Sequence, residues 1–158
     1  MMLLVAFFIQ IALAGTFTLW GTSVHFFPAV LMFWASSASS PIAFGVSLVA
    51  GLVYSVVSSE YPGVYAVGFS LGALSVAYLR GTMNDDRVWV RSLHVIVGII
   101  IYVLVTGAIF YMIKEREAAV WLHIAREGAL QIVIIVLLTF ISSMRKRMRN
   151  RKMYATAY

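Results

Sequence analysis

The sequence predicts an all-α fold, an integral membrane bundle of about six transmembrane helices. Three observations predict it: 62% of the 158 residues are hydrophobic, only 11% are charged, and the apolar residues fall into long runs separated by short turns. A soluble domain of this length needs more charge on its surface, whereas a membrane-spanning helix needs about 20 mostly apolar residues. We therefore expect one transmembrane domain over residues 1–143 and a basic tail over residues 144–158.

The first two spans come before residue 36. Met1–Leu19 contains no charged side chain and is long enough to cross a bilayer. Ala12-Leu13-Ala14 has the small-residue pattern of a signal-peptidase cleavage site. A cleaved signal peptide is nevertheless the weaker alternative, because no Lys or Arg precedes the apolar run. The second span is short, about Val24–Ala35, and Pro28 fits its first turn because a missing N–H costs little there.

The third and fourth spans, Ala43–Val57 and Val64–Leu79, form a hairpin that is rich in small residues. The hinge between them ends in Pro62 and Gly63, and the glycines within the two spans are Gly45, Gly51, Gly68 and Gly72. Lipid provides no hydrophobic drive between helices, so helices that touch use small residues to bring their backbones close. We expect these residues to form a packing interface within the hairpin. A groove for a partner's single transmembrane helix is the alternative.

The last two spans are Ser92–Ile113 and Ala118–Ser143, separated by the charge-balanced linker Lys114–Glu117. The loop Arg80–Arg91 is the most polar internal segment, and Asp85-Asp86 within it is a natural N-cap region. Six of the twelve basic residues follow the sixth span, namely Arg145, Lys146, Arg147, Arg149, Arg151 and Lys152. This basic tail therefore dominates the charge distribution of the chain.

The distribution of Lys and Arg predicts the orientation of the bundle. Cytoplasmic loops carry an excess of these residues, so the basic tail, the N-terminus and the loop Arg80–Arg91 should all face the cytoplasm. Our first interpretation of the basic tail is that it is this orientation signal. A docking patch for anionic lipid at the cytoplasmic face, or for an acidic partner, is the alternative. Nucleic-acid binding is not expected, since no folded soluble module accompanies the basic run.

The sequence offers no set of residues for catalysis. Cysteine is absent, which excludes disulfides, thiolate metal sites and a cysteine nucleophile. His25, His94 and His123 lie on three different segments without metal-ligand spacing, and no Gly-x-Ser-x-Gly elbow is present. We therefore expect a protein that is not an enzyme, with no metal and no cofactor.

Arg126 and Glu127 are the charged residues expected inside the membrane, about two turns into the sixth span. Ionisable groups at such depth usually face the protein interior and are paired. Glu127 could meet His123 one turn earlier, and Arg126 could reach an outer carboxylate such as Glu60. The alternative is a helix that begins later and leaves Arg126 at the interface. Tyr54, near the hinge, is interpreted as part of an interfacial aromatic belt, with stacking on a ligand as the alternative. We also count Tyr54 and Pro28 among the residues of the partner or packing interface.

Several motifs, taken in order, resemble the MreD family of rod shape-determining membrane proteins. They are Phe27-Pro28-Ala29-Val30-Leu31-Met32, the Gly-rich stretch Phe44–Tyr54, Pro62-Gly63-Val64-Tyr65-Ala66-Val67, Leu79-Arg80-Gly81, and the run from Leu138 to Arg147. The chain departs from the family pattern at Tyr54, where Asp is frequent, and at Arg126-Glu127, where a small polar residue is more usual.

The resemblance implies a six-helix plan similar to that of the substrate-binding subunits of energy-coupling-factor transporters. It also implies a non-catalytic subunit of the cell-wall elongation complex in the bacterial cytoplasmic membrane. Such a subunit would bind the transmembrane helix and periplasmic region of MreC, with links to MreB and to RodA and its transpeptidase. The alternative function is a vitamin-binding membrane subunit of a transporter. That function needs an outward pocket with polar anchors, which the short outward loops disfavour.

Overall fold

The computed structural model describes residues 2–13, 18–19, 22–23, 25–57, 61, 63–82, 88–113, 122, 124–137 and 139. The predicted six-helix bundle is confirmed: it contains α1 (Met2–Leu13), α2 (Phe27–Ala35), α3 (Ser40–Val57), α4 (Val64–Thr82), α5 (Val88–Ile113) and a sixth helical run over residues 124–137. We call this last run the C-terminal helical segment. A two-residue hairpin, β1 (Thr18–Leu19) against β2 (Thr22–Ser23), lies between α1 and α2.

Three described helices are long and apolar enough to cross a membrane, namely Ser40–Val57, Val64–Thr82 and Trp89–Ile113. α2 is the short element that the sequence predicts, since nine residues rise only about 13.5 Å. The predicted end of the first helix at Leu19 is wrong, because α1 ends at Leu13 and Leu19 pairs with Thr22 in the hairpin. α5 begins at Val88, inside the segment predicted to be a loop.

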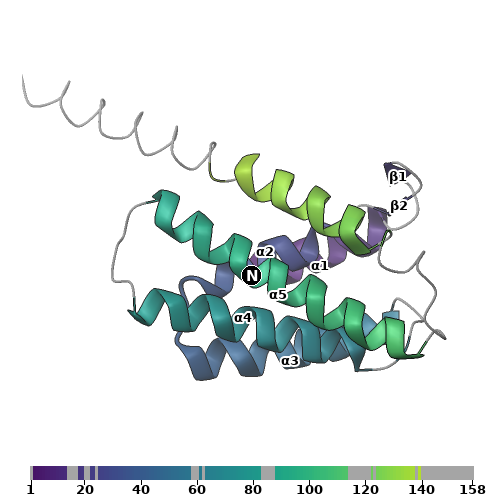
Figure 1. Cartoon of the computed structure of the whole chain (residues 1–158), viewed down its shortest axis with the longest axis horizontal. Helices are drawn as coiled ribbons and strands as arrows, with labels where there is room; N and C mark the ends of the chain where they lie inside the picture. The colour runs from purple at the N-terminus through teal and green to yellow at the C-terminus, as the bar shows by residue number, and fades with distance from the viewer. Residues whose placement is uncertain are drawn as a thin grey trace, which may run out of the picture.

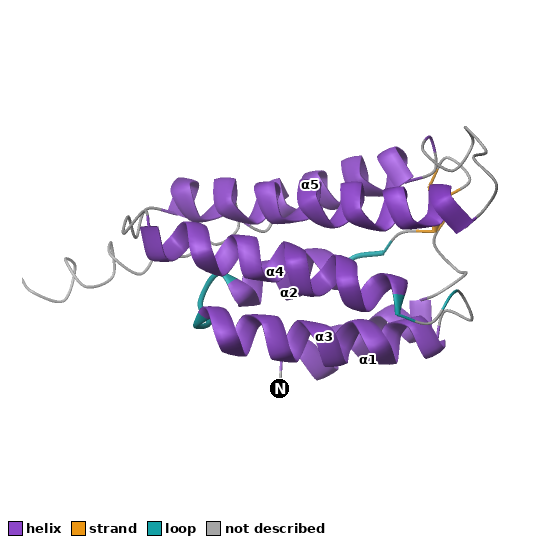
Figure 2. Cartoon of the chain, turned by 60° about the horizontal axis from the view of Figure 1, so that its bottom comes forward, coloured by secondary structure: helices purple, strands orange, loops and turns teal. Residues whose placement is uncertain are grey.

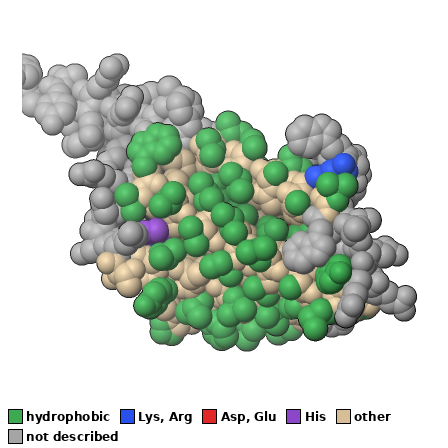
Figure 3. Space-filling view, in the orientation of Figure 1, with side chains coloured by type: hydrophobic (Ala, Val, Ile, Leu, Met, Phe, Trp, Pro, Cys, Tyr) green, Lys and Arg blue, Asp and Glu red, His purple; other side chains and the backbone are tan. Residues whose placement is uncertain are grey.

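α4 lies at the centre of the bundle. Figure 2 shows α5, α4 and α3 stacked as neighbouring layers, and Figure 1 shows α5 crossing α4 obliquely. More than half of the residues in the apolar stretch of α4 are buried (56%), against 28% in α3. On the face drawn in Figure 3, hydrophobic side chains cover much of the described surface, which suits a molecule surrounded by lipid.

α2 is buried among the longer helices, and a glutamine from α1 satisfies its first turn. Ala29, Leu31 and Met32 have no exposed surface. The Gln10 side-chain oxygen accepts hydrogen bonds from the backbone N–H of Phe26 (2.9 Å) and Phe27 (3.4 Å). These N–H groups have no partner within the helix itself. Gln10 therefore acts as a cap supplied from a different helix and joins α1 to α2.

Arg91 fastens α5 to the other end of α2. Its Nε donates to the Ser36 hydroxyl (2.6 Å), and its Nη2 donates to the Phe33 carbonyl (3.2 Å) and to the hydroxyl of Ser37. The guanidinium also lies 4.4 Å from the centre of the Phe33 ring. A cation is favourable at a helix C-terminus, where the last carbonyls lack intrahelical partners. One side chain thereby satisfies the end of α2 and the turn that follows.

We predict that Arg91→Ala lowers the free energy of unfolding by about 1.5–3 kcal/mol, because hydrogen bonds to a charged donor are lost at the end of α2. Arg91→Lys should fall between wild type and Arg91→Ala, since an ammonium cannot reproduce the planar fork of donors. Reversible unfolding in mixed micelles measures the effect. Arg80→Ala is the matched control, because exposed Arg80 lies at the same end of the bundle. An equal decrease in the free energy of unfolding for Arg80→Ala and Arg91→Ala would show that the hydrogen bonds from Arg91 to the end of α2 do not stabilise the fold.

Candidate functional site

Gly51 brings the backbones of α3 and α4 into direct contact. A Cβ placed on Gly51 would lie 2.6 Å from the Tyr65 carbonyl oxygen and 2.7 Å from the Ala66 backbone nitrogen. Both atoms belong to the backbone of the first turn of α4, so they cannot move aside as a side chain could. Close approach of this kind is what small residues provide in membrane helices.

Gly68 and Gly72 serve a different contact, between α4 and α5. A Cβ on Gly72 would lie 2.8 Å from the Gly98 carbonyl oxygen and 2.6 Å from the Met32 terminal methyl group. A Cβ on Gly68 would meet the hydroxyl of Thr106 and approach the Tyr102 ring to 3.1 Å. The prediction that these two glycines pack within the hairpin is therefore wrong, because the atoms nearest to them belong to α5 and to Met32 of α2, and none belongs to α3. Because α5 covers Gly68 and Gly72, a partner's helix would have to use another face of the hairpin.

The remaining residues singled out in the sequence lie in different parts of the bundle. Gly45 is exposed, and nothing lies within 4 Å of the place where its Cβ would be. Gly63 has a φ of +91° just before α4, a backbone conformation that favours glycine. Pro28 lies in the first turn of α2, as predicted, and is fully buried there. Pro62 and the basic tail from Arg145 to Lys152 lie outside the described residues.

Tyr54 lies inside the bundle, so its interpretation as part of an interfacial belt is wrong. Its side chain is 6% exposed and stacks on Phe27, with ring centres 5.9 Å apart and planes at 6°. It also contacts Tyr65 and Phe69, at 5.0 and 5.6 Å between ring centres. Its hydroxyl and the Gln10 amide nitrogen both meet Nδ1 of His25. Tyr54 therefore links α3 to the polar contacts at the start of α2.

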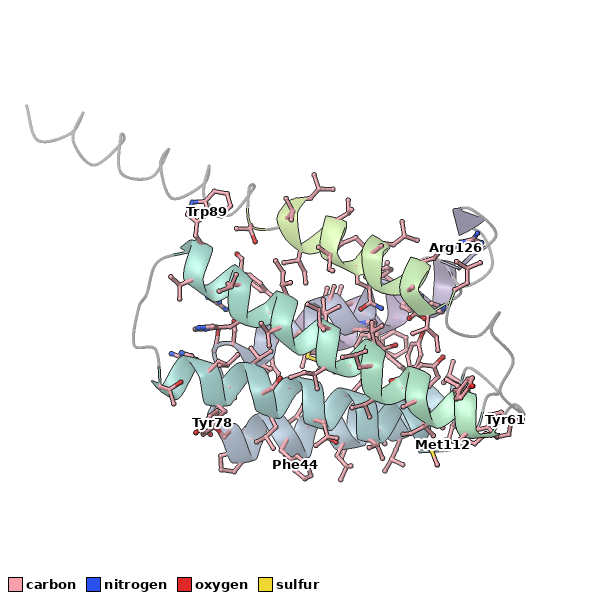
Figure 4. The ribbon with its side chains drawn as sticks, viewed as in Figure 1. Phe44, Tyr61, Tyr78, Trp89, Met112 and Arg126 are labelled. Carbon is pink, nitrogen blue, oxygen red and sulfur yellow. The ribbon has the colours of Figure 1, made fainter. Side chains whose placement is uncertain are left out.

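Glu127 belongs to a buried polar cluster between α5 and the C-terminal helical segment. Its side chain is 8% exposed, and its Oε1 accepts hydrogen bonds from the Tyr102 hydroxyl and from Gln131 Nε2, each at 3.1 Å. Arg126 is exposed and lies near the end of the bundle where Tyr61 and Met112 are also found (Figure 4). The suggested partners His123 and Glu60 lie outside the described residues.

Sequence reasoning missed several members of these clusters. Gln131 lies four residues after Glu127, and this spacing places the two side chains on one helix face, so it was a usable signal. Tyr102 lies 25 residues before Glu127, and no local pattern connects them. Gln10 is the polar residue within the apolar helix α1, which marks it as a candidate for a buried hydrogen bond.

The described residues contain no group of three or more His, Cys, Asp or Glu side chains that could hold a metal ion. The described part of the bundle holds the buried carboxyl of Glu127 with the hydroxyl of Tyr102 and the amide of Gln131, and a second polar contact in which Tyr54 and Gln10 meet His25, beside a core of aromatic rings. Such an arrangement fixes helices relative to one another.

A comparison with protein-family models matches residues 1–144 of the chain to a family described as rod shape-determining protein MreD. The corresponding comparisons with curated proteins and with solved structures gave no match. The family match covers every described residue, including both glycine contacts and the buried polar cluster.

We predict that Gly51→Ala and Gly72→Ala each lower the free energy of unfolding by about 1–3 kcal/mol, because a methyl group would press against backbone atoms of the neighbouring helix. Gly45→Ala is the matched control and should leave stability unchanged, since its methyl group would meet open space. Unfolding in mixed micelles measures all three variants. If Gly45→Ala proves as harmful as the other two, interhelical distance does not govern these positions, because alanine is itself a better helix former than glycine.

Proposed function

Because the chain belongs to the MreD family of rod shape-determining proteins, we propose that it is a non-catalytic membrane subunit of the cell-wall elongation complex. In this role it holds MreC and, through MreC, the peptidoglycan synthases RodA and its transpeptidase, with MreB on the cytoplasmic side. The observation that carries the proposal is the family match over residues 1–144. A role in rod shape follows from the family, and the partners are our proposal.

The packed interior supports a scaffold more than a ligand carrier. Phe27, Tyr54, Phe69 and Tyr102 are each no more than 6% exposed, and their rings contact one another in sequence from α2 to α5. Their side chains take up the space between the helices where a transporter subunit would need room for its substrate. No observation on the described residues favours the transporter alternative.

We place the MreC transmembrane helix on the outward face of α3. α3 is the least buried of the three long helices, and its exposed side chains include Ile42, Val49 and Val56. Gly45 lies one turn from Val49 on this face with open space above it. A partner helix can approach closely at such a position, and close packing is what drives helix association in lipid.

A complementation experiment tests both the role and the docking face. In a rod-shaped bacterium depleted of its own MreD, the wild-type chain should restore rods and co-purify with MreC. The Gly45→Leu variant should accumulate normally, but about tenfold less MreC should co-purify with it. A tenfold decrease corresponds to a loss of about 1.4 kcal/mol of binding free energy. Val49→Leu, on the same face, is the control and should resemble wild type.

The outcomes separate the two parts of the proposal. If a normal amount of MreC co-purifies with Gly45→Leu, MreC does not bind at this face of α3. That result would not affect the proposed role of the chain in rod shape. Cells that stay round although the wild-type chain reaches the membrane and binds MreC would contradict its place in the elongation complex.

We further propose that the chain is a multi-pass protein of the inner membrane with both termini in the cytoplasm. Arg80 lies in the last turn of α4 and Arg91 near the start of α5, so both mark one end of the bundle. Positive charge favours the cytoplasmic side. Trp89 and Tyr78 lie at this same end, and Tyr61 lies at the opposite end (Figure 4), as expected for aromatic side chains at the two membrane surfaces.

The absence of cysteine makes this orientation directly testable with single-cysteine variants. Tyr61→Cys should react with a membrane-impermeant maleimide in intact spheroplasts, because the exposed Tyr61 side chain would face the periplasm. Thr82→Cys should react only after the membrane is permeabilised. The reverse pattern of labelling would invert the proposed orientation.

A further inference from the structure

Arg91 carries hydrogen-bond donors that the end of α2 does not use. An arginine has five N–H donors in a planar fork, one on Nε and two on each Nη. The Nε donor goes to the hydroxyl of Ser36, and Nη2 donates to the Phe33 carbonyl and to the Ser37 hydroxyl. Among the described residues, no acceptor lies at Nη1. Because these contacts hold the guanidinium in place, the two donors on Nη1 point in a fixed direction.

The hydroxyl of Ser37 adds another donor beside this guanidinium. It accepts a hydrogen bond from Nη2 of Arg91, so its own proton is available to a further acceptor. The Ser37 side chain is exposed, whereas the Ser36 hydroxyl already donates to the Phe33 carbonyl at 2.6 Å. The same turn leads into α3, and the N-terminus of a helix also favours a negative charge. The donors at this end of the bundle therefore suit an anion.

Arg80 brings a second positive charge to the same end. It lies in the last turn of α4 with its side chain exposed, and it is close enough to Arg91 for the two charges to repel each other. Of the residues that the structure describes, the one acidic side chain is Glu127, which neighbours Arg126 at the opposite end (Figure 4). An anion between the two guanidinium groups would replace their repulsion with two attractive interactions.

Exposed aromatic side chains show that the two arginines lie at the depth of lipid headgroups. Trp89 and Tyr78 are 70% and 65% exposed and lie at this end of the bundle (Figure 4). Each precedes one of the arginines by two residues, a rise of about 3 Å along its helix. Exposed Trp and Tyr side chains concentrate at the interface between membrane and water. The phosphate groups of phospholipids occupy the same layer.

We propose that Arg80, Arg91 and Ser37 form a binding site for the phosphate group of an anionic phospholipid. Nη1 of Arg91 and the hydroxyl of Ser37 donate to the phosphate oxygens, and Arg80 supplies the second positive charge. Hydrogen bonds from guanidinium groups to phosphate are charge-assisted and strong, and basic sites between helices bind anionic headgroups. The bound lipid would join the end of α2 to the end of α4. The site meets headgroups in either orientation of the bundle and needs no contact with MreC.

Native mass spectrometry of the full chain in neutral-detergent micelles tests the proposal. The micelles contain equal amounts of phosphatidylglycerol and phosphatidylcholine, which both carry a phosphodiester but differ in net charge. The wild-type chain should retain phosphatidylglycerol in preference. Arg80→Gln should lower this preference about fivefold, which corresponds to about 1 kcal/mol for one basic residue at a membrane surface. Arg91 is left unchanged because it also holds the end of α2.

Two variants separate a built site from a general attraction of charges. Arg126→Gln removes the same charge from an exposed residue at the opposite end, so it should keep the wild-type preference. Ser37→Ala leaves the charge unchanged but removes a donor, so it should weaken retention of phosphatidylglycerol. An equal effect of Arg80→Gln and Arg126→Gln, or an unchanged preference in Ser37→Ala, would overturn the proposal. Equal retention of the two lipids by the wild-type chain would also overturn it.

The basic tail from Arg145 to Lys152 lies outside the described residues and is a second possible source of lipid binding. In a chain with these six basic residues replaced by Gln, Arg80→Gln should still lower the preference about fivefold. Loss of this effect would assign the lipid to the tail and overturn the proposed site. Displacement of phosphatidylglycerol by millimolar inorganic phosphate would overturn the assignment to a lipid, because the site would then prefer the free anion.

Discussion

The bundle depends on backbone contact between helices that lipid does not push together. α4 touches both of its long neighbours through glycine, with Gly51 against the start of α4 and Gly72 against Gly98 of α5. In lipid, dispersion forces and interhelical hydrogen bonds hold helices together, and both weaken steeply as backbones separate. The aromatic core between α2 and α5 can pack only because these two glycine contacts fix the distance between the helices.

Polar contacts then set the position of the short helix α2. Gln10 from α1 satisfies its first turn, and Arg91 from α5 satisfies its last turn and the following turn. Non-helical backbone at membrane depth is tolerated only where protein groups satisfy it. The two long polar side chains thus allow a nine-residue helix to exist inside the bundle, and they connect α1, α2 and α5.

The order of the helices, the short α2 and the close hairpin contact at Gly51 could be predicted from the sequence, because apolar runs, Pro28 and glycines are local signals. The helix that packs against Gly68 and Gly72 could not be predicted from the sequence. Small residues show that another backbone can approach closely, but they do not show which helix it belongs to. Tyr54 was misjudged because its nearness to the hinge says nothing about which face it takes. The contact of Tyr102 with Glu127 joins residues 25 apart, so it depends on how α5 and the C-terminal helical segment pack.

The length of α5 has a consequence for how the protein responds to its membrane. Its uncharged part after Arg91, the 22 residues Ser92–Ile113, rises about 33 Å, whereas the hydrocarbon core of a bilayer is about 30 Å thick. A helix that is too long tilts, and Figure 1 shows α5 crossing α4 at an oblique angle. Because Tyr102 on α5 holds Glu127, a change in this tilt carries the C-terminal helical segment with it. We therefore expect the angle at which α5 packs to depend on the thickness of the bilayer.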